Sequence, residues 1–230
     1  MKPVPSLAQV RAGLRGDVKV ASQDLNEAGS GAYTGDLAPA MIKDSGLDVA
    51  IVGHSERRAG RGETNDVVGL KTKAGIDAGL QVIACIGETL EQREAGQTLD
   101  VLTEQLAGIA KHVSDWTNVV VAYEPVWAIG TGVVATPEQA QEVHAGLRQY
   151  LATNVSQQVS DSLRILYGGS VTASNASELA ALPDVDGFLV GGASLKPEFV
   201  DIVNAGSANP EKGNSVNLGI NGFGRIGRLV

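Results

Sequence analysis

Short apolar runs alternate along this 230-residue chain with longer stretches of mixed polarity. The runs are continuous and rich in Val and Ile, which is typical of strands buried on both faces of a parallel sheet. They predict six strands, at residues 18–22, 49–53, 82–86, 119–123, 164–167 and 187–190. Repeated strand-then-helix units indicate an α/β fold with right-handed crossovers. Six units are enough for an open sheet and too few to close an eight-stranded barrel, so the pattern alone leaves the architecture open.

Helices are predicted between these runs. Thr136 can cap a helix that carries Pro137 in its first turn. The apolar positions of that helix recur every three to four residues and predict one buried stripe, made of Ala140, Val143, Leu147 and Leu151. Residues 63–79 and 89–113 show the same kind of pattern, so each is expected to be helical.

Composition narrows the function classes. The formal net charge of −8 offers no electrostatic footprint for nucleic acid or for an anionic membrane surface, so neither is expected as a partner. No apolar run approaches the ~20 residues that span a bilayer. The single cysteine, Cys85, excludes an intrachain disulfide and is interpreted as a buried core thiol.

Candidate chemistry follows the strands, because ligands of parallel α/β folds bind beyond the carboxyl ends of the strands. His54 follows the second predicted strand, where an imidazole can polarise a carbonyl or shuttle a proton. A hydrogen-bonded structural histidine is the alternative. His112 and His144 fall in predicted helices and are interpreted as structural.

Glu124 directly follows the fourth apolar run, so we expect it to be partly desolvated and more basic, as suits a general base. The residues behind it combine a rigid Pro125, an aromatic Trp127 and a Gly-Thr-Gly tip at 130–132, which together resemble a lid. The alternative is an ordinary strand-to-helix loop whose glutamate pairs with an arginine.

Two glycine pairs follow the last two predicted strands. They are Gly168–Gly169, which precedes Ser170, and Gly191–Gly192. Backbone N–H groups of such turns can bind phosphate, and they would have to do so locally because the net charge of the chain repels anions. Tight-turn geometry would require glycine as well and remains the alternative.

Five segments carry a family resemblance. Residues 122–132 resemble the catalytic glutamate and lid of the triosephosphate isomerase family, and residues 52–58 resemble its histidine segment. Residues 167–171 and 189–195 resemble its two phosphate-binding turns. Residues 29–35 resemble the loop that one subunit inserts into its neighbour. The segments occur in the family's order.

The resemblance implies a (β/α)₈ barrel, a homodimer, and interconversion of dihydroxyacetone phosphate with glyceraldehyde 3-phosphate without cofactor or metal. Glu124 would remove a proton alpha to the carbonyl and return it to the adjacent carbon, while His54, as neutral imidazole, stabilises the enediolate. This pairing is the family's own and is taken from the resemblance. Thr34 would lie near the active site of the partner subunit. The phosphate would be held by Gly130, Ser170, Gly191 and Gly192.

The chain departs from the family at its start. The resemblance covers about residues 5–205, and the chain opens at what corresponds to the family's second helix, residues 6–14. The first two strands, the first helix and an Asn-x-Lys segment have no counterpart, so we expect an N-terminally incomplete barrel. Glu56, which should face that lysine, would lose its partner. The strands at 18–22 and 187–190 would be left as unpaired edges.

The end of the chain differs as well. We divide the chain into an isomerase-like barrel at residues 1–205, a linker at 206–215 and the truncated start of a dinucleotide-binding domain at 216–230. In the last segment an apolar run leads into Gly222-x-Gly224-x-x-Gly227, a fingerprint that is weak alone. It resembles the opening of glyceraldehyde 3-phosphate dehydrogenase and predicts a fusion of the two enzymes.

Three expectations remain open at this stage. Cytoplasm is the default location, and the mitochondrion is the alternative that such fusions suggest. Another phosphate-binding barrel, such as a phosphoribosyl isomerase, would need a different acid–base pair. A catalytically impaired fragment that acts only within a larger fusion or dimer is the second alternative.

Overall fold

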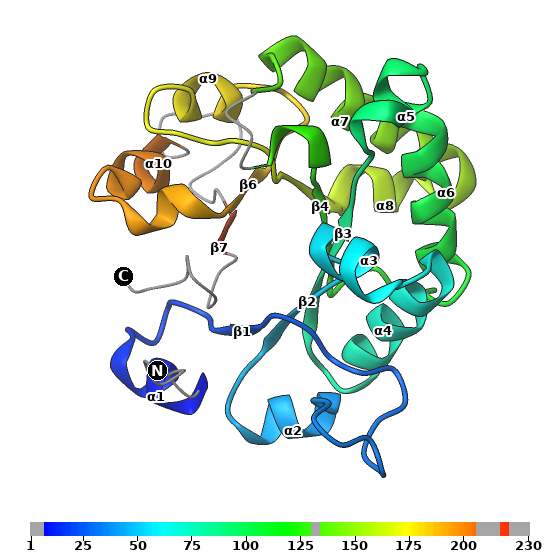
Figure 1. Cartoon of the computed structure of the whole chain (residues 1–230), viewed down its shortest axis with the longest axis vertical. Helices are drawn as coiled ribbons and strands as arrows, with labels where there is room; N and C mark the ends of the chain where they lie inside the picture. The colour runs from blue at the N-terminus through cyan, green and yellow to red at the C-terminus, as the bar shows by residue number, and fades with distance from the viewer. Residues whose placement is uncertain (1–6, 130–133, 206–216, 221–230) are drawn as a thin grey trace. The chain divides into compact units, whose positions relative to one another are not determined.

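The computed structural model describes residues 7–129, 134–205 and 217–220. All six predicted strands are present, and the α/β fold is confirmed (Figure 1). Their order in the sheet follows the chain, from β1 to β7. The strands are β1 (Ala21–Ser22), β2 (Val49–Val52), β3 (Gln81–Ile86), β4 (Val119–Tyr123), β5 (Arg164–Tyr167), β6 (Gly187–Val190) and β7 (Asn217–Ile220). Contacts divide the chain into two compact units, residues 1–85 with 105–120 and residues 86–104 with 121–230.

In the first unit, β1, β2 and β3 pair in parallel. The register joins Ala21 to Val49 and then runs from Val49↔Gln81 to Val52↔Ala84. Every residue of β2 is buried, as the continuous apolar run predicts, and α4 packs against this strand. The helices of this unit are α1 (Leu7–Gly13), α2 (Pro39–Asp44), α3 (Ser55–Arg61) and α4 (Asn65–Asp77). Cys85 is fully buried, which confirms its interpretation as a core thiol.

In the second unit, the long helix α7 (Pro137–Asn154) begins where the sequence predicts. Thr136 and Gln139 form a reciprocal capping box, in which each side chain accepts from the other's backbone N–H. The predicted stripe of α7 is buried throughout. The other helices are α5 (Leu90–Glu94), α8 (Gln157–Ser162), α9 (Ala176–Ala180) and α10 (Phe199–Ala205), together with α6 (Thr98–Ala110), which the division between the units crosses.

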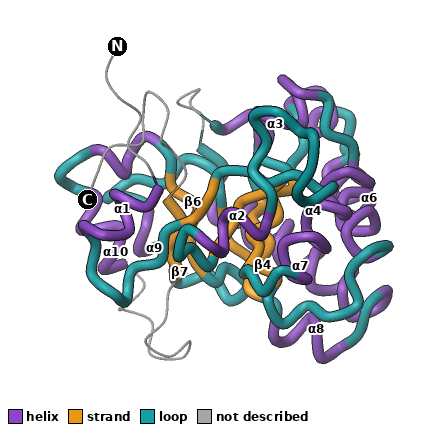
Figure 2. The backbone as a smooth tube through the Cα atoms, turned by 90° about the horizontal axis from the view of Figure 1, so that it is seen from below, coloured by secondary structure: helices purple, strands orange, loops and turns teal. Residues whose placement is uncertain are grey.

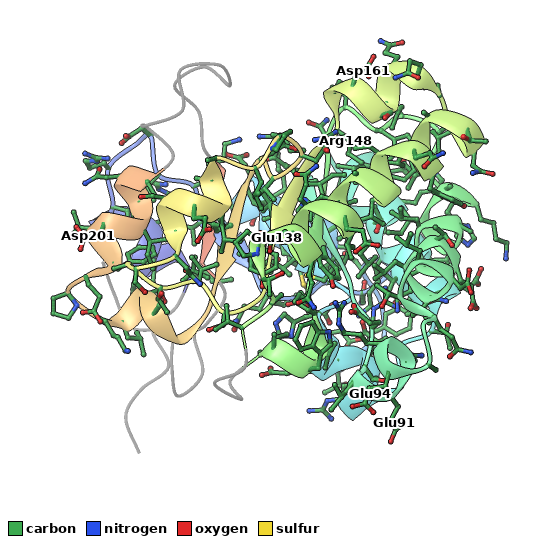
Figure 3. The ribbon with its side chains drawn as sticks, turned by 90° about the horizontal axis from the view of Figure 1, so that it is seen from above. Glu91, Glu94, Glu138, Arg148, Asp161 and Asp201 are labelled. Atoms are coloured by element: carbon green, nitrogen blue, oxygen red, sulfur yellow. The ribbon has the colours of Figure 1, made fainter. Side chains whose placement is uncertain are left out.

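Arg148 ties several of these elements together. Its guanidinium donates to the carbonyl oxygens of Ser160 (2.6 Å) and Leu163 (3.1 Å) and pairs with the carboxylates of Asp184 (2.9 Å) and Asp186 (2.6 Å). These partners lie on and after α8 and just before β6, so one side chain fixes α7 against both (Figure 3).

The prediction of a single helix over residues 89–113 is wrong. Thr89 caps α5, which ends at Glu94, and α6 begins at Thr98. Between them Gly96 has a φ of +71°. A residue in this left-handed conformation ends a helix, so the pattern is carried by two helices in sequence.

The prediction that the strand at 187–190 is an unpaired edge is also wrong. β7 pairs with β6 in parallel, in a continuous register from Gly187↔Asn217 to Val190↔Ile220. At the other end of the strand order, β1 has β2 as its neighbour among the described residues, as expected of an edge strand. No helix in the described ranges is both long and apolar enough to cross a membrane.

Candidate active site

Three neighbouring strands of the second unit deliver predicted site residues to the same end of the sheet. Glu124 follows β4 directly, Ser170 lies shortly after β5, and Gly191 follows β6. β4 and β5 are joined at this end by the bond from the Gly168 N–H to the Tyr123 carbonyl (2.7 Å), and β5 pairs in parallel with β6. Since carboxyl ends of parallel strands meet at one end of a sheet, these residues share one region.

Glu124 is 2% exposed, which confirms the expected burial. Its backbone N–H donates to the Ile86 carbonyl at 2.7 Å. A Cβ on Gly87 would lie 1.9 Å from the Glu124 carbonyl oxygen, and one on Gly168 would lie 3.0 Å from its Cγ. The first of these contacts requires glycine at position 87, and both show that Glu124 is packed tightly between the ends of β3 and β5.

Glu88 is a buried site residue that the sequence pattern did not single out. It lies near the end of β3 and is fully buried. Its Oε1 accepts from the Tyr123 hydroxyl (3.1 Å) and the Trp127 indole N–H (2.9 Å), and Arg93 lies 3.5 Å away. The Arg93 guanidinium also lies over the Trp127 ring. Burial and the adjacent Glu88 charge raise the pKa of Tyr123, so its hydroxyl stays protonated and donates. Glu124 was selected because it is a polar residue just after a strand. Glu88 lies just after β3, so the same rule could have found it.

The glycines of the two turns, after β5 and after β6, have different surroundings. A Cβ on Gly169 would lie 2.2 Å from the Tyr167 hydroxyl oxygen, so packing alone requires this glycine. A Cβ on Gly191 would meet nothing within 4 Å. Packing therefore does not account for Gly191, whose Cα borders open space. The turn is fixed by Ser194, whose N–H and hydroxyl both donate to the Gly191 carbonyl oxygen (3.0 and 2.7 Å).

Asn175 orders the turn after β5. Its side-chain oxygen accepts from the Thr172 N–H (2.7 Å), and its amide donates to the Ser170 carbonyl (3.0 Å). The Ser170 carbonyl is thereby held within the turn, which leaves the half-buried Ser170 in one defined backbone conformation.

His54 belongs to the first unit, where it follows β2 and caps α3. Its Nδ1 accepts a hydrogen bond from the Glu56 N–H at 3.3 Å. An accepting Nδ1 carries no proton, so the neutral ring carries its proton on Nε2. This is the tautomer that can donate a hydrogen bond to a developing oxyanion.

The residues on both sides of His54 explain its motif. Gly53 has a φ of +67°, and a Cβ there would lie 2.7 Å from Val68, so both backbone and packing require glycine. Arg58 donates to the Gly53 carbonyl (2.9 Å), the Asn65 side chain (2.8 Å) and the Cys85 carbonyl (3.0 Å). The imidazole is therefore held by a local framework of α3, β2 and β3.

Arg57, the other arginine of that motif, belongs to a partly buried ion cluster that we define as Asp24, Arg57, Glu63 and Lys71. Lys71 contacts Asp24 (2.9 Å) and Glu63 (2.7 Å), and Arg57 contacts the same two carboxylates (2.7 and 2.6 Å). Burial raises the pKa of Asp24. Burial would also raise the pKa of Glu63, but hydrogen bonds from Lys71 and Arg57 outweigh it and lower that pKa.

The other residues predicted for the site make few described contacts or lie outside the described residues. The side chain of Glu56 is exposed, and its described contact with His54 is through the backbone N–H. Thr34 is exposed in a loop of the first unit. Gly130 and the rest of the predicted lid tip, residues 130–132, lie outside the described residues. Before them, Pro125 leads into a short 3₁₀ helix, Val126–Ala128, which places Trp127 against Glu88.

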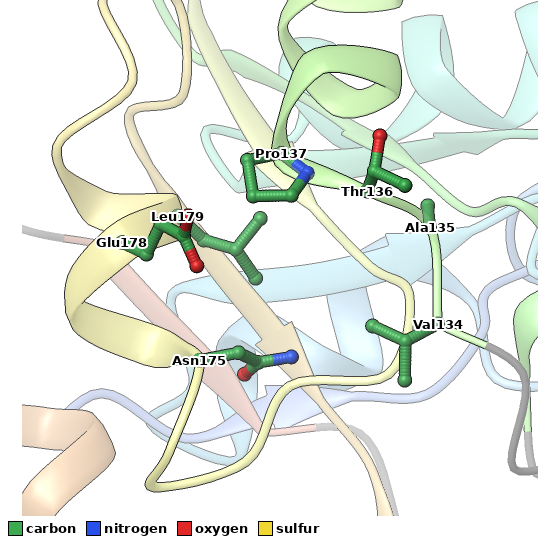
Figure 4. Close-up of a pocket in the computed structure, with 7 residues that line it drawn as sticks. All are labelled: Val134, Ala135, Thr136, Pro137, Asn175, Glu178 and Leu179. Carbon is green, nitrogen blue, oxygen red and sulfur yellow. The ribbon is translucent and has the colours of Figure 1, made fainter.

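Two described cavities are lined by neither Glu124 nor His54. One of about 280 Å³ is formed in the second unit where the start of α7 faces α9 (Figure 4), and it is lined by Val134, Ala135, Thr136, Pro137, Asn175, Glu178 and Leu179. The other, of about 210 Å³, borders the ion cluster. Among the residues that the structure describes, no group of three or more His, Cys, Asp or Glu side chains could hold a metal ion.

Comparison with known proteins identifies the family. The family described as triosephosphate isomerase matches residues 1–206. A rice (Oryza sativa subsp. japonica) protein named "Triosephosphate isomerase, cytosolic" is 58% identical over 203 residues, which is 88% of this chain and 80% of that protein. These matches assign the chain the isomerisation of dihydroxyacetone phosphate and glyceraldehyde 3-phosphate, and they do not favour a catalytically impaired fragment. The chain therefore belongs to the triosephosphate isomerase family, whose members have the (β/α)₈ barrel fold.

Proposed function

We propose that Glu124 and His54 act on one triose phosphate as base and electrophile. Glu124 takes a proton from the hydroxymethyl carbon of dihydroxyacetone phosphate, and the carbonyl oxygen becomes an enediolate oxygen. His54 Nε2–H donates to that oxygen. The proton of the neighbouring hydroxyl group passes to that oxygen, the C–O bond of the outer carbon becomes the aldehyde C=O, and Glu124 returns its proton to the former carbonyl carbon. Support comes from the burial of Glu124 and from the acceptor role of His54 Nδ1.

The observation that carries this proposal is the position of Glu124. Gly87 and Gly168 pack closely against it, at the end of the sheet where parallel α/β folds bind ligands. A base fixed in this way loses little freedom when it meets its substrate. Fixed geometry of this kind supplies a large part of enzymatic rate enhancement.

The substrate phosphate is proposed to bind the backbone N–H groups of Gly130, Ser170, Gly191 and Gly192. The open space beside the Cα of Gly191 supports this role, because it leaves room for a ligand to approach the turn. Because the chain has a net charge of −8, long-range attraction cannot hold the phosphate, and local N–H donors must do so.

The test is steady-state kinetics on substitutions of the two residues. We expect Glu124→Gln to lower kcat by about 10³–10⁴ and His54→Gln by about 10²–10³, since each removes a group that acts in the transition state. Glu138→Gln, at a glutamate in the first turn of α7, is the matched control and should leave kcat unchanged. Solvent-deuterium incorporation at the hydroxymethyl carbon of dihydroxyacetone phosphate gives a second readout. Full activity of Glu124→Gln would refute its assignment as base.

The Asn-x-Lys segment of the family defines a second arm of this test. The 230 residues contain no Asn-x-Lys sequence, and we expect a chain extended at its start by a segment with the family's Asn-x-Lys motif to turn over faster by about 10²–10³, the contribution of one transition-state charge contact. Turnover that is undetectable in both chains would contradict the proposed function. Equal rates would show that the lysine is dispensable here.

We further propose a homodimer that uses the loop at residues 29–35. The support is an exposed apolar surface on this loop and the adjoining α2, where Tyr33 (48%), Leu37 (45%) and Met41 (51%) are exposed. Thr34 lies within this surface. Sedimentation equilibrium tests the proposal, and Met41→Lys should shift the population toward monomer.

The last segment and the location of the chain complete the proposal. Residues 216–230 are proposed to come from a fusion with a glyceraldehyde 3-phosphate dehydrogenase, on the strength of the fingerprint at 222–227. Mass spectrometry of the natural polypeptide for dehydrogenase peptides tests this.

Cytoplasm is the proposed compartment, following the printed name of the rice relative. Cell fractionation distinguishes it from the mitochondrial alternative, which the comparisons do not support.

A further inference from the structure

β7 is a strand of the sheet that lies outside the family match. The family covers residues 1–206, whereas β7 spans Asn217–Ile220. All four of its residues pair with β6, and the two strands lie side by side in Figures 1 and 2. A strand outside the family match therefore pairs with a strand inside it.

β6 has a physical need for such a neighbour. All four of its residues are buried, and β5 is its neighbour on the opposite side. A strand with one bare edge leaves backbone N–H and C=O groups without strand partners. In a closed barrel every strand has two neighbours, so a β6 without β7 would be an edge where the family fold has none.

The connection between the two strands suits parallel pairing. β6 is followed by α10, and residues 206–216 lead from α10 to β7, which makes a strand–helix–strand unit. Because both strands belong to one chain, their pairing is intramolecular, so even four residue pairs can form.

β6 also carries the candidate phosphate turn. Gly191 follows its last residue directly, and Gly192 begins the short helix that Ser194 fixes to the Gly191 carbonyl. Displacement of the end of β6 would displace both N–H groups. We propose that residues 217–220 act as an added edge strand that holds β6 in register and thereby positions Gly191–Gly192 for the substrate phosphate. The positioning part of this inference rests on the proposed function.

The test compares the 230-residue chain with a variant in which Leu218→Pro removes one strand N–H and fixes φ. Hydrogen exchange in β6 should accelerate by at least about tenfold, because the strand opens more easily. KM for the triose phosphate should rise about tenfold, the factor for roughly one hydrogen bond to a charged group, while kcat changes little. A truncation that removes residues 222–230 and keeps β7 is the matched control and should match the parent in both.

Addition in trans provides the second measurement. A chain ending at Ala205 should regain slow exchange in β6 and a low KM when a millimolar peptide of residues 214–222 is added. The same peptide with Leu218→Pro should have no effect. If the truncated chain aggregates, hydrogen exchange in the intact chain tests the pairing instead. The backbone N–H groups of residues 217–220 must then exchange as slowly as those of β6.

Two results would overturn the inference. One is exchange of residues 217–220 at unprotected rates in the intact chain, and the other is unchanged exchange in β6 after Leu218→Pro. A chain without isomerase activity whose β6 still responds to Leu218→Pro would refute the proposed function and keep the strand pairing, so the two failures are distinguishable.

Discussion

At the scale of single residues, the space around Glu124 makes the sharpest prediction. Gly87→Ala would place a Cβ 1.9 Å from the Glu124 carbonyl oxygen, which is backbone and cannot rotate away. The strand end must shift, and we expect a stability loss of about 1–3 kcal/mol, as for an overpacked core. A shift of about 1 Å in the base should lower kcat by about 10²-fold. Kinetics and urea unfolding of the same variant measure both effects.

Gly60→Ala is the matched control for this substitution. Gly60 lies in α3 and is exposed, and a Cβ added there would meet nothing within 4 Å. Alanine there should stabilise the helix by about 0.5–1 kcal/mol and leave kcat unchanged. Wild-type kcat in Gly87→Ala would mean that the contact with Glu124 does not set the position of the base.

The residues at the site were predictable only in part. Glu124 and His54 could be found because each directly follows an apolar run, and the burial of Glu124 is confirmed. The cluster around Glu88 could not be found from local pattern, since its partners Tyr123 and Trp127 are 35 and 39 residues away. Sequence also could not separate Gly169, which packing requires, from Gly191, which packing does not.

At the scale of elements, the ion cluster joins α3, α4 and the segment after β1. The Lys71 side chain is 6% exposed and neutralises Asp24 and Glu63. Lys71→Met removes one cation and leaves buried carboxylates undercompensated, so we expect a loss of about 3–5 kcal/mol in the free energy of unfolding. Lys73→Met on the same helix breaks an exposed pair with Asp77 and should cost at most about 0.5 kcal/mol. Urea denaturation of both variants makes the comparison.

The pH dependence of the stability lost in Lys71→Met shows whether the loss comes from charge or from packing. The pKa of Glu63 lies below its ordinary value of 4.5, so its ion pairs stabilise the native chain above that pH and the stabilisation is lost as the pH falls below it. Without Lys71, Arg57 alone opposes the effect of burial, so the pKa of both carboxyls should rise, and acid would relieve the penalty. The deficit of Lys71→Met should therefore shrink between pH 7 and about pH 4.5. A constant deficit would indicate lost packing instead.

Helices and strands were predictable where one pattern of apolar residues runs through the whole segment. The six strands follow from uninterrupted Val/Ile runs, and α7 follows from its cap and its stripe. The break between α5 and α6 was missed because apolar spacing continues through Gly96, whose left-handed backbone ends the first helix. Pairing of β7 with β6 was missed because strand neighbours depend on contacts between distant segments, which a local pattern does not contain.

At the scale of the whole molecule, the two proposals for the end of the chain make competing demands on one strand. As an added edge strand, residues 217–220 pair with β6. As the first strand of a dinucleotide-binding sheet, they would lie between two other strands, because the first strand is internal in that fold. Both edges of residues 217–220 would then be paired within that sheet, and β6 would lose its neighbour.

This competition can be measured by extending the chain beyond Val230 with the rest of a dehydrogenase dinucleotide-binding domain. We expect exchange in β6 to accelerate to the rate of the Leu218→Pro variant, since the larger sheet offers the strand a second neighbour and more pairs. The matched control carries the same domain with its own complete first strand, placed after Val230, so that residues 217–220 stay available to β6. Slow exchange in the control and fast exchange in the extended chain would establish that one strand serves two sheets in turn. Equal, slow exchange in both would mean that pairing with β6 outcompetes the second domain.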